Sequence, residues 1–208
     1  MKFIPKKIKI LYKNLPLKDK LQVYLRWPLC PFERIEEHIP KKGTIIDIGC
    51  GRGMLCNLAS TNSEERNVIG LDFSNQRIID AKKTILNRKN IQFINADILD
   101  KQLPDADCII MSDVLHHIAI SEKPNVLKKI YTKLNSTGVF LLQDVARKPL
   151  LKFWFTYGAD YFLQKGQGLT YQKHEELEKL LINAGFKVEI LQIHKGYPVA
   201  DVLFVCKK

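Results

Sequence analysis

The chain has 208 residues, of which 46% are hydrophobic and 26% charged, and its formal net charge is +11. This length suits one domain with a sizeable core, and the composition excludes the weakly hydrophobic, highly charged class of disordered chains. Five widely spaced cysteines form no C-x-x-C pair, and no apolar run has the length of a signal peptide or a membrane span. We therefore expect a cytoplasmic protein with reduced thiols and no catalytic metal.

The first segment of the chain is strongly basic, because residues 1–20 hold seven lysines against one carboxylate, Asp19. Such a segment can meet the phosphates of nucleic acid or of an anionic membrane surface, or it can be a solvated tail, and the sequence leaves these alternatives open. Residues 18–27 and 32–39 predict one or two helices. We interpret residues 1–40 as a basic arm and helices that pack on the core, and residues 41–208 as the main domain.

From residue 44 onward, short apolar runs alternate with amphipathic stretches, which predicts parallel strands joined by crossover helices. The expected helices are 54–59, 74–87, 122–134 and 174–184, with Ser74 and Ser121 as N-caps and Gly185 as a C-terminal stop. The expected strands are 44–48, 67–71, 91–94, 108–111, 138–143, 187–192 and 199–206. The last two are separated by a short turn and should form an antiparallel hairpin at a sheet edge. The fold class is therefore α/β, with a mostly parallel seven-stranded sheet and helices on both faces.

Residues 147–171 interrupt this alternation with seven aromatic side chains. A long segment between a strand and the next helix often covers an α/β site, although aromatic density at helical spacing is also typical of plain packing. We interpret this segment as an insertion that covers the substrate.

A glycine-rich turn follows the first strand, where Asp47 precedes Gly49, Cys50, Gly51 and Gly53. Glycines at this spacing let the chain turn tightly and let a ligand approach its backbone. A nicotinamide-binding loop would read G-x-G-x-x-G and would need glycine where this chain has Met54. Such a turn can bind several nucleotide-like ligands, or it can be purely structural. The acidic residues that follow it are needed to distinguish these alternatives.

Two further carboxylates end the next two strands. Asp72, followed by Phe73, stands where a carboxylate can accept both hydroxyls of an adenosine ribose, while Phe73 flanks the adenine. Asp97 stands where it can accept a hydrogen bond from the adenine amino group, and the alternative is that it caps a helix. With Asp47, three carboxylates lie at the strand ends where open α/β sheets bind ligands.

With these motifs, the chain from about residue 44 to 145 resembles the class I, Rossmann-like S-adenosylmethionine-dependent methyltransferases. The resemblance implies S-adenosylmethionine as cofactor and S-adenosylhomocysteine as product. It also implies that residues 49–53 line the methionine part of the cofactor, that Asp72 holds the ribose, and that Asp97 with Ile98 recognises adenine.

The segment from Met111 to Ile118 is similar to that of family members that act on small molecules and quinone-like lipids. The resemblance places Ser112 near the methionine end of the cofactor. His116 or His117 could serve as the base for a hydroxyl, amine or acidic carbon, and Asp113 could orient the substrate or a histidine. The alternative is that one histidine packs on the sheet and the other has no role.

Three functions remain open from the sequence. The first is methyl transfer to a small-molecule or lipid-like acceptor, and the second is methylation of RNA, which the basic charge invites. Methyltransferases of exocyclic base amines usually carry Asp/Asn-Pro-Pro-aromatic after the fourth strand, where this chain has Ser112, Asp113, Val114 and Leu115. The third is S-adenosylmethionine binding without catalysis. The acceptor atom and the oligomeric state are not encoded in these patterns.

Overall fold

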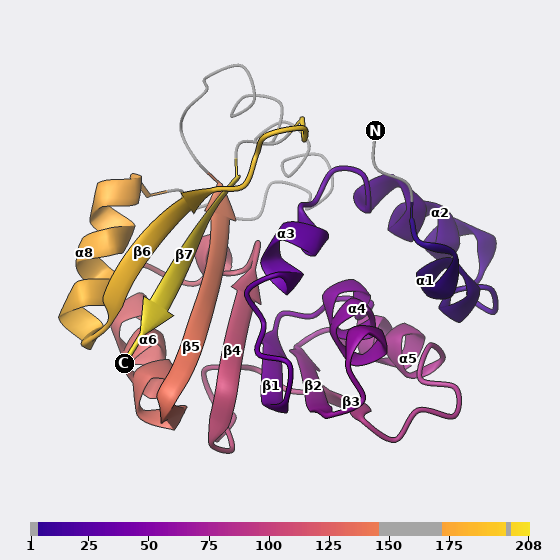
Figure 1. Cartoon of the computed structure of the whole chain (residues 1–208), viewed down its shortest axis with the longest axis horizontal. Coiled ribbons are helices and arrows are strands. Elements are labelled where there is room, and N and C mark those ends of the chain that lie inside the picture. The colour runs from indigo at the N-terminus through magenta and orange to yellow at the C-terminus, as the bar shows by residue number, and fades with distance from the viewer. Residues whose placement is uncertain (1–3, 146–171, 199–200) are drawn as a thin grey trace.

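The computed structural model of the chain describes residues 4–145, 172–198 and 201–208, so the aromatic segment 147–171 and the start of the predicted strand 199–206 lie outside the described residues. In the described residues, seven strands form one sheet in the order β3-β2-β1-β4-β5-β7-β6. The first five are parallel, and β7 runs antiparallel to β5 and to β6 (Figure 1). This confirms the predicted sheet with its antiparallel C-terminal pair.

The strands are β1 (Gly43–Ile48), β2 (Arg66–Asp72), β3 (Ile91–Asn95), β4 (Ala106–Ser112), β5 (Leu134–Val145), β6 (Lys187–Gln192) and β7 (Asp201–Lys207). The helices are α1 (Lys6–Leu11), α2 (Leu17–Arg26), α3 (Phe32–Glu36), α4 (Met54–Asn62), α5 (Asn75–Lys82), α6 (Lys123–Lys133) and α8 (His174–Ala184), with a 3-10 turn η1 (Leu115–His117). Strand β1 is paired with β2 on one side and β4 on the other, and all of its last four residues are buried, as its apolar sequence predicts.

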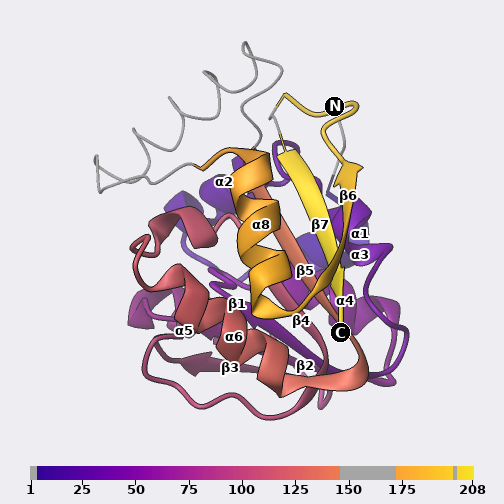
Figure 2. The ribbon, with the colours of Figure 1, turned by 90° about the vertical axis from the view of Figure 1, so that its left-hand side faces the viewer.

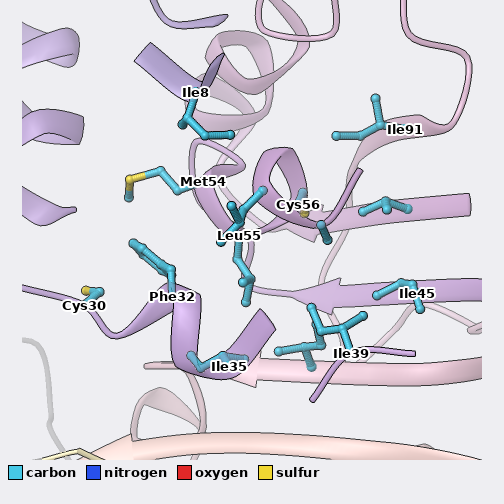
Figure 3. Close-up of a cluster of buried hydrophobic side chains, with 14 of the residues drawn as sticks. Ile8, Cys30, Phe32, Ile35, Ile39, Ile45, Met54, Leu55, Cys56 and Ile91 are labelled. Atoms are coloured by element: carbon cyan, nitrogen blue, oxygen red, sulfur yellow. The ribbon is translucent and has the colours of Figure 1, made fainter. Parts of the chain in front are cut away.

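Two hydrophobic clusters cover the two faces of the sheet. The first joins the sheet to helices α1 to α5, and Figure 3 shows Ile8, Phe32 and Leu55, from three of these helices, in one cluster with Ile45 of β1. The second joins the sheet to α6 and α8, which lie side by side in Figure 2. Strands β1 and β4 are neighbours in the sheet, and the helices that follow them, α4 and α6, pack on opposite faces. The strand order therefore reverses between β1 and β4. Open α/β sheets bind their ligands at such a point.

Helix α1 lies in the basic segment for which a solvated tail was one interpretation. Ile8 and Tyr12 are fully buried, and the Tyr12 hydroxyl donates to the carbonyl of Arg52 over 3.1 Å and accepts from Asn57 over 2.8 Å. For residues 6–12 the tail interpretation is therefore wrong. The spacing of Ile8, Leu11 and Tyr12 gives the helix one apolar face, and this face packs on α4.

Several helix boundaries differ from those that the sequence predicts: α3 ends at Glu36 rather than at residue 39, and α4 at Asn62 rather than at residue 59. Ser74 caps α5 as expected, accepting from the N–H of Arg77, but the helix ends at Lys82 rather than at residue 87. Helix α6 has Glu122 as its N-cap instead of Ser121. A turn precedes the helix, in which the carbonyl of Ala119 accepts hydrogen bonds from the N–H groups of Glu122 and Lys123. Gly185 ends α8 in the left-handed conformation, as predicted.

Candidate functional site

The glycine loop between β1 and α4 is held against the end of β2. The N–H groups of Gly49 and Cys50 donate to the carbonyl of Leu71 over 2.7 and 2.9 Å. Gly49, Gly51 and Gly53 all have positive φ, of +74°, +56° and +76°, and Gly53 is the N-cap of α4. The backbone path of this loop therefore requires residues that adopt the left-handed region without strain.

The three glycines face different surroundings. A Cβ on Gly49 would lie 2.2 Å from Cγ2 of Val114, and a Cβ on Gly53 would lie 2.4 Å from Cζ of Phe93. A Cβ on Gly51 would meet no atom within 4 Å. Packing thus excludes side chains at the first and third glycines, whereas the middle glycine borders open space that a ligand can use.

Asp72 connects this loop to the next helix. The residue is 2% exposed, its Oδ2 accepts from the N–H of Gly51 and its Oδ1 from that of Ser74, each over 2.8 Å. A carboxylate has about four acceptor positions, so Asp72 keeps capacity for two further donors such as ribose hydroxyls. Phe73, beside it, is 72% exposed, which leaves its ring available to a flat ligand.

After β3, Asp97 is exposed and its Oδ1 accepts from the N–H of Leu99 over 2.9 Å, so it caps a turn, whereas the alternative interpretation expected it to cap a helix. Ile98 is buried in the second hydrophobic cluster. Asn95, which sequence reasoning missed, donates from Nδ2 to the carbonyls of Asp72 and Phe73 over 2.9 and 2.8 Å. These bonds fix the end of β3 to the end of β2.

Asp47 and Cys56, a residue of α4, are buried beneath the loop, and Cys50 of the loop is half-buried. Sγ of Cys56 donates to Oδ2 of Asp47 over 3.1 Å. Burial, and then the nearby charge of Asp72, raises the pKa of Asp47 to about 7. Burial also raises the pKa of the Cys50 thiol above its ordinary value, so Cys50 stays a thiol near neutral pH rather than a nucleophilic thiolate.

A second group of polar side chains lies around the end of β4. Ser112 donates to Oε1 of Gln143 on β5, and Gln143 donates from Nε2 to Oδ1 of Asp113 over 2.8 Å. Arg26, at the end of α2, donates from Nη2 to Oδ2 of Asp113 over 3.1 Å. Asp113 itself has φ +57°, an uncommon conformation for a residue with a side chain. The network fixes this strained residue from two sides.

The two histidines lie in different environments. His116 is 1% exposed, and its Nδ1 lies 2.9 Å from Oδ1 of Asp144 at the end of β5. The His117 ring lies 4.1 Å from that of His116, centroid to centroid, and this residue is exposed on one side. Partial burial, and then neighbouring His116, lowers the pKa of His117 to about 4. His117 is therefore neutral at pH 7.

Sequence reasoning missed four polar residues around this second group: Arg26, Lys123, Gln143 and Asp144. Lys123 is fully buried and donates from Nζ to Oε1 of Gln172 over 2.8 Å. Burial lowers the pKa of Lys123, and the charge of Asp144 partly offsets this. The sequence did indicate Gln143 and Asp144, because these two polar residues directly follow an apolar strand. Buried polar side chains need hydrogen-bond partners, so both were candidates for a polar network.

Among the residues that the structure describes, no three His, Cys, Asp or Glu side chains gather as a metal site requires. Nor does any described helix have the length and apolarity needed to cross a bilayer.

Residues 28–191 of the chain match the family model of the "Methyltransferase domain". A carboxy-S-adenosyl-L-methionine synthase of Nautilia profundicola is 29% identical over 171 residues, which are 74% of this chain and 73% of that protein. Among solved structures, an S-adenosylmethionine-dependent methyltransferase of Aquifex aeolicus has a TM-score of 0.68 at 19% identity, covering 99% of this chain and 98% of that one. An O-methyltransferase family 2 protein of Planctomyces limnophilus, in complex with apigenin, has a TM-score of 0.73 at 17% identity over 90% of this chain and 60% of that one.

The family model spans well over half of the chain, and the solved structures share its fold. The chain therefore belongs to the methyltransferase domain family and is an S-adenosylmethionine-dependent methyltransferase.

Proposed function

We propose that this enzyme methylates a hydroxyl group of a small-molecule acceptor and that His116 removes the proton. The observation that carries this proposal is the contact of 2.9 Å between Nδ1 of His116 and Oδ1 of Asp144. Two residues at the ends of adjacent strand segments thereby form a histidine-carboxylate pair, the arrangement that orients a general base. His116 lies in the turn η1, which follows Ser112, the last residue of β4.

The residues of the glycine loop and those that follow β2 and β3 fit the cofactor. Gly51 borders open space, and Asp72 keeps acceptor positions beyond the two that Gly51 and Ser74 occupy. We assign residues 49–53, including Cys50 and supported by Asp47, to the methionine part, and Asp72 to the ribose. Phe73 would flank the adenine, and the turn of Asp97 and Ile98 would border its amino group. Ser112 would lie at the methionine end.

S-adenosylmethionine supplies a methyl group on a positively charged sulfur, and its transfer is an in-line displacement. What the chain has to provide is the position and the protonation state of the acceptor. Because a carboxylate only accepts hydrogen bonds, Asp144 makes Nδ1 of His116 the donor, and in this tautomer Nε2 is the basic nitrogen of the ring. The same carboxylate stabilises the imidazolium that forms.

Asp113 and His117 have supporting roles in this proposal. Arg26 and Gln143 hold the Asp113 carboxylate in place, so it can orient the acceptor beside the histidines. His117 is neutral at pH 7 and is a weak base, because its pKa is lowered to about 4. The hydroxyl proton is thus expected to go to His116.

Support for a small molecule rather than RNA comes from the relatives. The Planctomyces limnophilus neighbour is a complex with apigenin, and the Nautilia profundicola relative is named for a product made from the cofactor itself. That relative suggests a second candidate, in which the product is a carboxy derivative of S-adenosylmethionine. The two candidates differ in whether the acceptor or the cofactor is recovered with an added carbon.

The test is incubation with S-adenosylmethionine carrying a labelled methyl group and a panel of phenols, aliphatic alcohols, amines, carboxylic acids and transfer RNA, followed by mass spectrometry. We expect S-adenosylhomocysteine and a labelled methyl ether. His116→Gln and Asp144→Asn should lower kcat at least about a hundredfold, the usual contribution of a general base, whereas Asp105→Asn, at an exposed position, should not. Label only in RNA, a carboxylated cofactor, or unchanged kcat in His116→Gln would contradict the proposal.

A further inference from the structure

The outward face of helix α2 is apolar. Leu17, Leu21 and Leu25 are 80%, 55% and 60% exposed, and their spacing of four residues aligns them along one side of the helix. Val23, on the opposite side, is 1% exposed. A surface helix normally turns its leucines toward the core and its charges toward water, so α2 presents the reverse of the usual pattern along this stripe.

The rotation of α2 is fixed by the polar side chains on its inner side. Arg52 of the glycine loop donates to Asp19 and to Oε1 of Gln22, the latter over 2.6 Å, and Arg26 donates to Asp113. These contacts hold α2 over the functional site. Turning the leucines inward would break all three, so their exposure belongs to the folded state.

Lysines surround the leucine stripe. Ile10 of α1 is 55% exposed, and a surface hollow of about 370 Å³ between α1 and α2 is lined by Lys6, Lys9, Ile10, Lys13, Lys20 and Tyr24. Lys18 lies on the other side of the stripe and is exposed. We call this surface the α1–α2 face: Ile10, Leu17, Leu21 and Leu25 with Lys6, Lys9, Lys13, Lys18 and Lys20. Figure 1 shows both helices at the outer side of the molecule, away from the β6–β7 edge.

We infer that the α1–α2 face docks on an anionic lipid bilayer, with the leucines among the acyl-chain ends and the lysines at the phosphates. Apolar side chains on a helix flanked by lysines bind such interfaces through buried apolar area together with attraction to anionic headgroups. A second copy of this chain fits the face less well. In a symmetric contact between two such faces, the lysines of one would meet the lysines of the other, and like charges repel.

Docking in this orientation would place the functional site next to the lipid surface. The inner side of α2 contacts Arg52 and Asp113, and a helix is about 10 Å across, so only α2 separates these residues from the bilayer. An acceptor that partitions into lipid would reach the site without crossing bulk water. The docking itself does not depend on the identity of the acceptor.

The test is flotation of the full chain with vesicles of phosphatidylcholine alone or mixed with phosphatidylglycerol, at low and high salt. We expect flotation with the anionic vesicles at low salt and little with the neutral ones, because lysine attraction is screened by salt. The variant Leu17→Gln/Leu21→Gln/Leu25→Gln should reduce vesicle binding at least about tenfold, since three exposed leucines lose their burial in lipid. All three positions are exposed, so folding is retained.

The matched control is Leu99→Gln/Ile120→Gln/Ile182→Gln, which removes apolar side chains of 45%, 58% and 52% exposure elsewhere. It should float as the wild type does. A Leu21→Trp variant gives an independent readout, because its emission should shift to the blue and be quenched by brominated lipids. Absence of flotation at low salt, or wild-type binding by the triple leucine variant, would overturn the inference. So would a dimer in sedimentation that the leucine variant dissociates, since that assigns the face to a second copy.

Discussion

The N–H of Gly51 donates a hydrogen bond to Oδ2 of Asp72 over 2.8 Å, which joins the middle glycine of the loop after β1 to the carboxylate that ends β2. The two residues lie 21 positions apart in the chain and meet because β1 and β2 are parallel neighbours that end at the same edge of the sheet. An acidic side chain is thereby held at the border of the only loop glycine, among Gly49, Gly51 and Gly53, that faces open space.

Asp72→Ala should strongly weaken cofactor binding while the protein stays folded. The change removes the acceptor for the ribose hydroxyls and for the Gly51 N–H, and hydrogen bonds to a charged acceptor contribute about 1.5–3 kcal/mol each. We expect Kd for S-adenosylhomocysteine to rise by about a hundredfold or more, and its thermal stabilisation to disappear. Calorimetric titration and melting curves measure both, with Asp105→Asn as the control. Stabilisation by NADH in place of either sulfur cofactor would contradict the assignment.

Gly51→Ala and Gly49→Ala should separate binding from stability. Both residues have positive φ, which costs a residue with a Cβ about 1–2 kcal/mol. Only at Gly49 would the new methyl group also collide, at 2.2 Å from Val114, so this variant should lose more stability in urea unfolding. Gly51→Ala should lose only the backbone cost of about 1–2 kcal/mol, and it should bind the cofactor more weakly because its methyl group enters the open space. Equal cofactor affinity of wild type and Gly51→Ala would show that the ligand lies elsewhere.

The central strands could be predicted from the sequence because they are apolar runs with a paired strand on each side. Ile45 and Ile46 of β1, both fully buried, point to opposite faces of the sheet. Helix α1 could not be recognised as easily, since its lysines dominate its composition and its apolar face becomes visible only when it packs on α4. The prediction of Ser121 as the N-cap of α6 was wrong, because the preceding turn determines where the helix begins and this turn depends on tertiary structure.

Within the site, sequence patterns located residues that follow strands but not their partners. His116 and Asp144 are 28 positions apart, and their contact depends on the register of β4 and β5, in which Ser112 lies opposite Gln143. A shift of the register would give each residue another neighbour, and no local pattern specifies this pairing. Arg26 is a similar case, because its contact with Asp113 requires α2 to lie over the site.

Arg52→Met should loosen the N-terminal helices. Arg52 donates hydrogen bonds to Asp19 and Gln22 of α2 and to Asp80 of α5. The variant therefore removes these links of α2 and α5 to the glycine loop. It also leaves the buried carboxylate of Asp80 with fewer partners. We expect a loss of about 1–3 kcal/mol in the free energy of unfolding. Trypsin should cleave within residues 6–20 faster than in the wild type. The control is Arg34→Met, whose partner Glu37 is exposed, and equal cleavage of the two variants would contradict the role given to Arg52.

Asp47→Asn should flatten the dependence of stability on pH. In the folded protein the pKa of Asp47 is raised from 3.8 to about 7 because burial disfavours its charged form. An acid whose pKa is raised on folding contributes most stability below its unfolded pKa, and this contribution is lost as the pH rises through the folded pKa. Between pH 5 and pH 8 the wild type should therefore lose stability from this group, by at most roughly 3 kcal/mol, because only the interval from pH 5 to the folded pKa of about 7 contributes. The asparagine is neutral at both pH values and can still accept from Cys56, so the variant should gain stability relative to the wild type as the pH rises. Urea unfolding of the cofactor-free protein at pH 5 and pH 8 measures this, and a difference between the two proteins that is the same at both pH values would show that Asp47 is ionised throughout this range.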